Sequence, residues 1–275
     1  MTTSSVGVVT IAHGRHDHLA AQHASLARGT RTPDRYVVVA MADARLAPAD
    51  RSGLRREVLR IDAAPEGLPL AAARNLGARH LADVDVLIFL DVDCLAGRDL
   101  VTAYVQAVQA DPGRVWSGPV TYLPPAPDGG YDLDRLVELD DPHPGRPAPA
   151  PGTVADQTDP GLFWSLSFAL ARPAWDRTGG FCEEYVGYGG EDTDYARVAL
   201  RAGLGLAWVG SARAYHQFHP VSSPPVQHVR DIVRNARLFY RRWGAWPMLG
   251  WLEDFERAEL IERDTHGFPH VVRPR

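Results

Sequence analysis

Cysteine is scarce in this 275-residue sequence, and its hydrophobic residues never form a run long enough to cross a membrane. The two cysteines, Cys94 and Cys182, are too few for a disulfide framework. Neither belongs to a Cys-x-x-Cys pair, which excludes the zinc and redox motifs built on that pair. Residues 1–5 lack the charged and apolar segments of a signal peptide. These absences predict a soluble, cytoplasmic protein with no transmembrane segment.

A concentrated block of one charge is also absent. The chain carries 29 Lys and Arg residues against 34 Asp and Glu residues, for a formal net charge of −5. General affinity for nucleic acid depends on clustered basic residues, so no nucleic-acid partner is expected. A small anionic molecule could still bind at a local site. The length and the 45% hydrophobic content suit one large domain, or one domain with an extension, around a substantial core.

Segments with strand-like and helix-like hydrophobic patterns alternate along the chain, which predicts βαβ units and a largely parallel sheet. Strands are expected at residues 6–12, 36–41, 58–61, 84–90, 115–122, 162–171, 206–209 and 212–215. Helices are expected at residues 18–28, 70–81, 98–110, 173–178, 191–201 and 226–243.

A proline-, aspartate- and glycine-rich stretch interrupts this alternation at residues 119–152. Proline and glycine disfavour helix and sheet, so a long surface loop is expected there, with one helical turn near residues 133–139. Loops of this length often act as lids or binding loops. We therefore predict one domain over residues 1–220 that contains this loop, followed by a helical extension over residues 221–275.

Two acidic residues, Asp91 and Asp93, directly follow the apolar run at residues 86–90. In open α/β sheets, ligands bind beyond the carboxyl ends of the strands. Carboxylates are hard oxygen ligands that suit Mg²⁺ or Mn²⁺, and such a cation can hold a diphosphate. The alternative is a turn with two solvated acids, because Asp-x-Asp occurs often without a function.

Residues 187–194, with the sequence GYGGEDTD, place glycines and an aromatic residue before a cluster of acids. Glycines let the backbone approach a ligand closely, and the positive end of a helix favours the acids that open it. The alternative is a helix that is only N-capped by Asp192 or Thr193, with no catalytic role. Farther on, His216 or His219 could complete a metal site begun by Asp93, although a single histidine is as often structural.

These segments resemble GT-A glycosyltransferases. Asp91-Val92-Asp93 resembles the DXD motif, particularly that of family 2. Residues 179–192, GGFCEEYVGYGGED, resemble the GGF…GWGGED segment of family 7 β-1,4-galactosyltransferases and chondroitin-polymerase-like enzymes. Residues 12–19 and 74–77 match the first-strand loop and the helix before the DXD strand, in the same order. The resemblance covers about residues 6–220 and implies a GT-A fold, in which helices flank a mixed, mainly parallel Rossmann-like sheet.

The resemblance implies a metal site and a catalytic base. Asp93, helped by Asp91, would hold Mn²⁺ or Mg²⁺ against the donor diphosphate. His216 would be the preferred third protein ligand, with His219 as its rival. Asp192 would be the general base on the acceptor hydroxyl, and Glu191 would shape that site.

The resemblance also implies residues on the nucleotide-sugar side. Arg15 would line the nucleotide pocket, and Asp43 would contact the uracil or the ribose. Arg74 belongs to the matching segment 74–77 and is assigned to donor binding. Tyr188 would stack on a sugar ring at the position where family 7 has tryptophan.

The predicted activity is metal-dependent transfer of a sugar, by default a UDP-linked hexose, to the hydroxyl of a saccharide or a small natural product. A single base opposite the leaving group gives direct displacement, so inversion of the anomeric centre is expected. One alternative is a sugar nucleotidyltransferase, although residues 12–15 make a poor version of the basic, glycine-rich loop it needs. The other alternative is a nucleotide-sugar-binding protein without catalysis.

Overall fold

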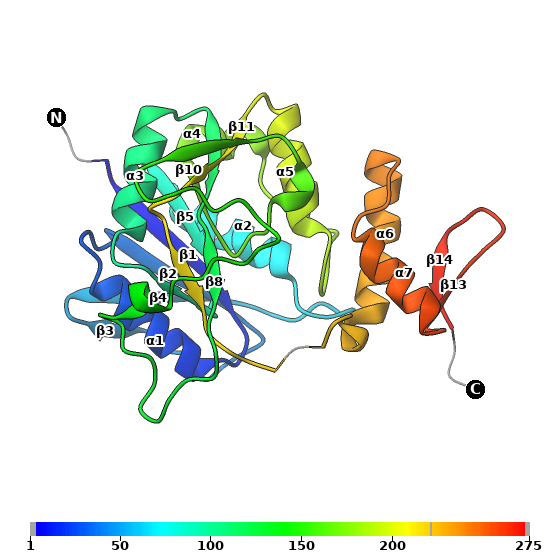
Figure 1. Ribbon diagram of the computed structural model, residues 1–275, viewed down its shortest axis with the longest axis horizontal. Coiled ribbons are helices and arrows are strands. Elements are labelled where there is room, and N and C mark those ends of the chain that lie inside the picture. Colours follow the sequence, from blue (N-terminus) through cyan, green and yellow to red (C-terminus); the bar gives the residue numbers. More distant parts are fainter. Residues whose placement is uncertain (1–3, 221, 273–275) are drawn as a thin grey trace.

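The computed structural model describes residues 4–220 and 222–272, and Figure 1 shows a central sheet flanked by helices. Within these residues nine strands form one mixed sheet, in the order β3-β4-β2-β1-β5-β10-β7-β11-β9. Their bounds are β1 (Val6–Ala12), β2 (Arg35–Met41), β3 (Ala49–Arg51), β4 (Leu54–Ile61), β5 (Val86–Leu90), β7 (Arg114–Ser117), β9 (Val154–Gln157), β10 (Ser167–Ala171) and β11 (Gly205–Val209).

Two smaller sheets and the helices complete the described part of the chain. One small sheet joins β6 (Cys94–Ala96), β12 (Ala214–His216) and β8 (Val120–Tyr122), and the other joins β13 (Ile261–Arg263) and β14 (Pro269–Val271). The helices are α1 (His16–Ala27), α2 (Leu70–His80), α3 (Leu100–Ala110), α4 (Arg172–Thr178), α5 (Glu191–Arg201), α6 (Val229–Trp243) and α7 (Leu249–Arg257), with short 3₁₀ turns η1 (Leu136–Leu139), η2 (Pro160–Leu162) and η3 (Val226–His228).

The central strands are covered on both faces, which explains why their sequences are continuous apolar runs rather than alternating ones. Every residue of β1 and β5 is buried. Helix α2 packs against β1 and β2 through Gly77, where an added Cβ would lie 2.5 Å from the side chain of Val9. The small residue therefore sets how closely this helix approaches the sheet.

The carboxyl ends of β1, β2 and β5 meet at one edge of the sheet, because these strands are parallel neighbours. The loops that follow them carry residues 13–15, 42–43 and 91–93. The small sheet lies at the same edge, since β6 begins directly after Asp93, and its register pairs His216 with both Cys94 and Tyr122. Segments far apart in the sequence thus converge beside Asp93.

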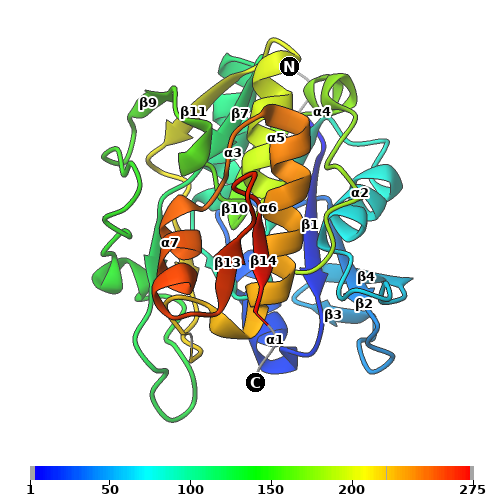
Figure 2. The same cartoon turned by 90° about the vertical axis from the view of Figure 1, so that its right-hand side faces the viewer.

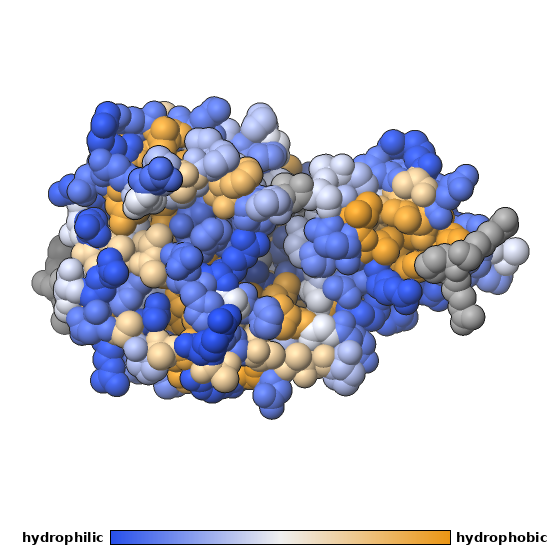
Figure 3. Space-filling model, turned by 90° about the horizontal axis from the view of Figure 1, so that it is seen from below, coloured by the Kyte–Doolittle hydropathy of each residue, from blue (hydrophilic) through white to orange (hydrophobic). Residues whose placement is uncertain are grey.

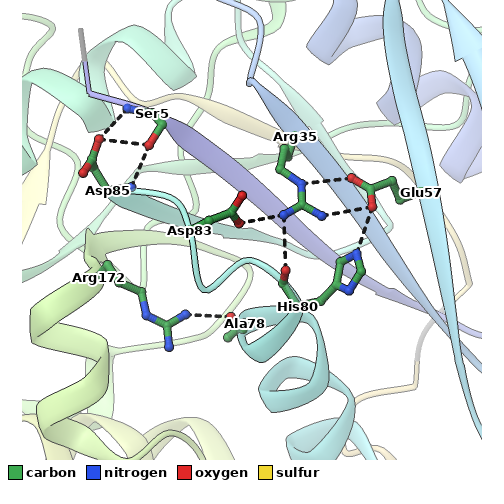
Figure 4. Close-up of polar contacts among 8 residues, drawn as sticks. All are labelled: Ser5, Arg35, Glu57, Ala78, His80, Asp83, Asp85 and Arg172. Atoms are coloured by element: carbon green, nitrogen blue, oxygen red, sulfur yellow. Dashed lines mark hydrogen bonds and ion pairs between the residues drawn. The ribbon is translucent and has the colours of Figure 1, made fainter. Parts of the chain in front are cut away.

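At the amino ends of these strands, charged side chains tie neighbouring segments together (Figure 4). Arg35, which begins β2, donates two hydrogen bonds to Glu57 of β4, at 3.1 and 3.0 Å, and one to Asp83 at 2.7 Å. Glu57 also pairs with His80 at the end of α2. Asp85, just before β5, accepts hydrogen bonds from the backbone and the hydroxyl of Ser5. These contacts lie at the end of the sheet opposite the loops described above.

We expect Arg35→Ala to lower the free energy of unfolding by about 1 kcal/mol, because two partly exposed ion pairs are lost together. Urea unfolding followed by circular dichroism measures the change. Arg135→Ala is the matched control, because its pair with Glu138 is well exposed on both sides and should contribute less than the Arg35 pairs. Equal effects of the two substitutions would contradict a structural role for the Arg35 pairs.

Several predicted elements differ from the structure. The single strand expected at residues 115–122 is wrong, because β7 and β8 belong to different sheets. The chain turns at Gly118, where an added Cβ would lie 2.0 Å from the carbonyl oxygen of Ala212. Residues 162–171 contribute strand only from Ser167, after the turn η2. The loop expected at residues 119–152 contains β8 at its start and η1 where a helical turn was expected.

The C-terminal extension was predicted to be helical. This is only partly correct, because β13 and β14 form a hairpin after α7. Ile232, Leu252 and Phe255 belong to a second apolar cluster that is separate from the main core. Figure 2 shows α6 lying over α5, with α7 and the hairpin next to α6, and the ion pair of Arg242 with Asp194 joins the two helices. Among the described residues, no helix combines the length and apolar character needed to span a membrane.

Candidate active site

Arg74 links the end of β5 to the start of α5. Its guanidinium lies 3.2 Å from the carboxylate of Asp91 and 3.2 Å from that of Glu191, and its side chain is 5% exposed. A buried guanidinium is tolerated only where carboxylates compensate its charge. Arg74 therefore holds Asp91 and Glu191, which are 100 positions apart in the sequence, close to each other.

Asp93 is surrounded by three histidines from two parts of the chain. Its Oδ1 lies 2.5 Å from Nδ1 of His18, and its Oδ2 lies 3.5 Å from Nε2 of His219. Its carbonyl oxygen accepts a hydrogen bond from the backbone N–H of Gln217 at 2.7 Å, which fixes the segment after β12 beside it. One ligand atom each from Asp93, His216 and His219 lie within 4.8 Å of one another.

This cluster has the chemistry of a divalent cation site. A carboxylate oxygen and imidazole nitrogens suit Mn²⁺, and their spacing is close to that of atoms that share one ion. Burial lowers the pKa of His216 to about 4, so its ring is neutral at neutral pH, which is the form that binds metals. Asp91 lies outside the cluster, because its carboxylate faces Arg74.

Tyr122, which the sequence did not single out, stacks on the ring of His216. The two ring centroids are 4.5 Å apart with an interplanar angle of 19°. Tyr122 also contacts His143 from the proline-rich loop, and His143 in turn contacts Trp164 edge to face. A row of aromatic rings thus runs from the candidate cation site along the wall of a cavity.

Asp192 is the second residue of α5 and lines this cavity. Burial and the negative charge of Glu191 raise the pKa of Asp192 to about 7, and the hydrogen bond from the backbone of Thr193 at 2.7 Å only partly offsets this. Oε2 of Glu191 is buried with no hydrogen-bond partner among the described residues. The carboxyl group of Asp192 can therefore exchange a proton near neutral pH.

The glycines of segment 187–190 make room for the C-terminal extension. An added Cβ would lie 2.3 Å from the carboxylate of Asp231 at Gly187, and 2.9 Å from the sulfur of Met248 at Gly189. Both glycines also have positive φ angles, at which other residues are strained. The glycines were predicted to admit a ligand, and the structure shows that their bare faces admit α6 and the start of α7.

The extension also anchors α5 through Asp194, whose side chain is fully buried. Asp194 accepts hydrogen bonds from Arg242 and Trp243 of α6, each at 2.6 Å, and from the hydroxyl of Tyr185 at 3.2 Å. Sequence reasoning missed this role. The only signal was a third acid in a helix that already carried two acidic residues assigned to catalysis.

Tyr188, predicted to stack on a sugar, stacks on His228 from the extension, with ring centroids 4.7 Å apart, and also contacts Trp251. It is 40% exposed and lines the cavity. One edge of its ring system therefore remains open to a ligand.

On the nucleotide side, Asp43 is engaged by its own loop. Its carboxylate accepts hydrogen bonds from the backbone of Gly14 at 2.8 Å and of Arg45 at 3.0 Å, and Nε2 of His16 lies 3.0 Å away. Burial opposes ionisation of Asp43, but the two backbone hydrogen bonds outweigh it and lower its pKa. Arg15 has a positive φ of 53° and points its Nε toward Asp93 at 3.7 Å.

The cavity has a volume of about 780 Å³, within the range of small-molecule sites. Asp91 and Asp192 both line it, as do Arg74 and Tyr122. Asp93, His216 and His219 are not lining residues, but they adjoin the cavity through Tyr122. Part of the wall, including Trp246 to Trp251, comes from the extension, so the predicted boundary at residue 220 crosses the site.

No protein-family model matches this chain, and no curated protein matches it either. Solved structures do match. S. aureus TarS 1–349 in complex with UDP-GlcNAc aligns with a TM-score of 0.60 at 13% identity, over 86% of this chain and 66% of that one. GalNAc-T7 with UDP, GalNAc and Mn²⁺ aligns with a TM-score of 0.54 at 17% identity, over 93% of this chain and 57% of that one.

The whole of S. aureus TarS aligns with a TM-score of 0.57 at 13% identity, and this chain spans only 39% of its length. These structures are GT-A glycosyltransferases, and the likeness shows that this chain has the GT-A fold. The predicted fold class is thereby confirmed. The assignment to family 2 or family 7 stays a prediction.

Proposed function

We propose that this protein transfers a sugar from a UDP-linked donor to a hydroxyl acceptor, with inversion and with a divalent cation. One observation carries the proposal. A partly buried carboxyl group with a raised pKa, Asp192, shares a cavity with the end of β5, where Asp93, His216 and His219 gather. The catalytic region of residues 1–220 would supply the chemistry, and residues 221–275 would close one side of the cavity.

Asp93, His216 and His219 would hold Mn²⁺ or Mg²⁺. When bound, such a cation would neutralise negative charge on the diphosphate leaving group. His18 would fix the orientation of Asp93, and Tyr122 that of His216, as residues behind metal ligands commonly do. Asp91 would stay paired with Arg74 and so would shape the donor side of the cavity rather than bind the ion.

Asp192 would accept the proton of the acceptor hydroxyl. A base works best when its pKa lies near the pH at which it operates, and burial places the pKa of Asp192 there. Glu191 raises that pKa through its charge and is itself held by Arg74. Tyr188 would contact a sugar ring at the mouth of the cavity, and Arg15 would lie near the diphosphate through its position beside Asp93.

Two measurements test this function. Thermal unfolding with a panel of nucleotide sugars and Mn²⁺ should show stabilisation by a UDP-hexose, because a ligand that binds only the folded state raises the melting temperature. Transfer from that donor should then release UDP and give a product with inverted anomeric configuration. Pyrophosphate release from a nucleoside triphosphate would support a nucleotidyltransferase instead. Donor binding without turnover across a broad panel of hydroxyl acceptors would contradict a transferase.

Turnover should rise with pH through about 7. Below the raised pKa of Asp192 its carboxyl group is protonated and cannot accept a proton, so kcat should fall about tenfold for each pH unit well below 7. The measurement is kcat at saturating donor, acceptor and Mn²⁺ between about pH 5 and pH 9. A profile that stays flat down to pH 5 would show that the carboxyl group of Asp192 is not the base.

A further inference from the structure

Arg197 places a positive charge in the cavity that the proposed chemistry does not use. It lies on α5 four residues after Thr193, and both side chains line the cavity. Four residues make about one turn of a helix, or roughly 6 Å along its axis. Arg197 lies five residues after the proposed base Asp192, or roughly 7.5 Å farther along the axis of α5.

The Arg197 side chain is held by aromatic rings rather than by acids. Its guanidinium carbon lies 5.0 Å from the ring centre of Phe239 and 5.6 Å from that of Trp243. Its Nε is buried without a hydrogen-bond partner in the described part of the chain. Asp194, one turn earlier on the helix, is taken by Arg242 and Trp243. The Arg197 residue as a whole is partly buried, and no carboxylate of the described residues pairs with it, so the protein leaves its positive charge uncompensated.

The other charged groups of the cavity do not supply that anion. Asp91 and Glu191 are paired with Arg74 rather than with Arg197. Asp192 belongs to the reacting end. Asp159 lines the cavity, but its Oδ1 accepts a hydrogen bond from the backbone of Gly161 at 2.8 Å, and it forms no ion pair with Arg197. Among the described residues, Arg197 therefore lines the cavity without a carboxylate partner, which leaves its guanidinium available to pair with an anionic ligand.

Apolar groups of the extension form the wall around this end of the cavity. Trp246, Met248, Leu249 and Trp251 contribute to it, and Trp164 comes from the catalytic region. Figure 3 shows apolar surface on the right-hand part of the molecule, where Figure 1 places α6, α7 and the hairpin. Binding sites of this kind, mostly apolar with a few fixed polar groups, orient their ligands through those groups.

We propose that the acceptor carries a carboxylate or phosphate group that pairs with Arg197, while a hydroxyl roughly 7–8 Å away along the axis of α5 faces Asp192. Arginine suits this role because its planar group donates two parallel hydrogen bonds to either anion. The position of the hydroxyl rests on the proposed function, whereas the anion subsite does not. The ring that carries the anionic group would pack against the tryptophans of the wall.

Two pairs of probes test the subsite by isothermal titration calorimetry. p-Nitrophenyl β-glucuronide is compared with p-nitrophenyl β-glucoside for the carboxylate, and glucose 6-phosphate with glucose for the phosphate. Each titration is done with and without UDP and Mn²⁺. The wild-type protein should bind the anionic member of at least one pair about tenfold more tightly, the size expected for a hydrogen bond to a charged group. Arg197→Gln should abolish that preference.

Arg201→Gln is the matched control. Arg201 lies one turn farther along α5, and its guanidinium carbon is 4.3 Å from the ring centre of Trp243, but it is exposed and does not line the cavity. It should therefore keep the preference for the anionic probe. The proposal is overturned if the wild-type protein binds both members of each pair equally or binds none of them, or if Arg201→Gln loses the preference as Arg197→Gln does.

The same titrations separate the subsite from the proposed function. If UDP with Mn²⁺ does not bind but the anionic preference depends on Arg197, the transferase proposal fails and the subsite stands. If UDP with Mn²⁺ binds and no anionic preference is found, the subsite fails and the transferase proposal stands.

Discussion

Asp192→Asn should reduce kcat by a factor of about 10² to 10⁴, the usual contribution of a general base, while UDP binding with Mn²⁺ stays unchanged. Asparagine has nearly the same shape as aspartate but cannot take a proton from the acceptor hydroxyl. Asp192 lines the cavity and has no ion pair among the described residues, so its replacement breaks no charge pair. Initial rates of UDP release and calorimetric titration with UDP measure the two effects.

The stability of Asp192→Asn provides the control for folding. Because burial raises the pKa of Asp192 to about 7, ionising it costs folding free energy, and that cost is fully present above pH 7. The variant should therefore melt at the same temperature as the wild-type protein or higher at pH 8. Near-wild-type turnover in a well-folded variant would exclude Asp192 as the base, and a lower melting temperature would show that its carboxylate is structural.

Asp93→Asn should remove the dependence of UDP binding on Mn²⁺. Asp93 is the only carboxylate of the three-residue cluster, and an amide is a poorer ligand for a divalent cation. In the wild-type protein, Mn²⁺ should tighten UDP binding, EDTA should abolish transfer, and added Mn²⁺ should restore it. In the variant, UDP should bind equally weakly with and without Mn²⁺, and turnover should fall by at least about 100-fold.

Asp83→Asn is the matched control for this substitution. Asp83 precedes β5 at the opposite end of the sheet, where it pairs with Arg35 (Figure 4). This variant should keep the full effect of Mn²⁺ on UDP binding. Full wild-type activity in EDTA, or an unchanged Mn²⁺ effect in Asp93→Asn, would contradict a cation site at Asp93.

The sequence predicted the elements of the fold well where hydrophobic runs are continuous. Helix α5 has the bounds expected, and β1, β2 and β5 differ by at most two residues. These segments are buried on both faces, so their pattern depends little on the rest of the chain. Strands β3, β6 and β9 were missed because they are only three or four residues long. The pairing of β6 and β9 also depends on β12 and β11, which are distant in sequence.

The site residues illustrate the same limit. Asp93 and Asp192 were proposed as site residues from the sequence because each lies in a distinctive local motif, and their roles stay predictions. His18 was not, because it is one of eleven histidines and its contact with Asp93 spans 75 positions of sequence. Tyr122 was missed for a similar reason, since only the pairing of β8 with β12 brings it to His216.

Arg74 was assigned to donor binding, yet its buried position between Asp91 and Glu191 shows a structural task that no local pattern reveals. The glycines of segment 187–190 were likewise expected to leave room for a close neighbour, but that neighbour was expected to be a ligand. Their close neighbours, Asp231 and Met248, lie in the C-terminal extension, and the sequence did not indicate that it meets these glycines. Both cases depend on packing between distant segments, which sequence spacing does not encode.

The central claim is that a cation at the end of β5 and a proton acceptor at the start of α5 act in the same cavity, the cation on the donor diphosphate and the base on the acceptor hydroxyl. A crystal structure with UDP and Mn²⁺, with the metal located by its anomalous scattering, tests it most directly. We predict one strong anomalous peak among Asp93, His216 and His219, with the diphosphate of UDP bound to it and directed into the cavity that Asp192 lines. A peak elsewhere, or UDP bound outside that cavity, would contradict the account.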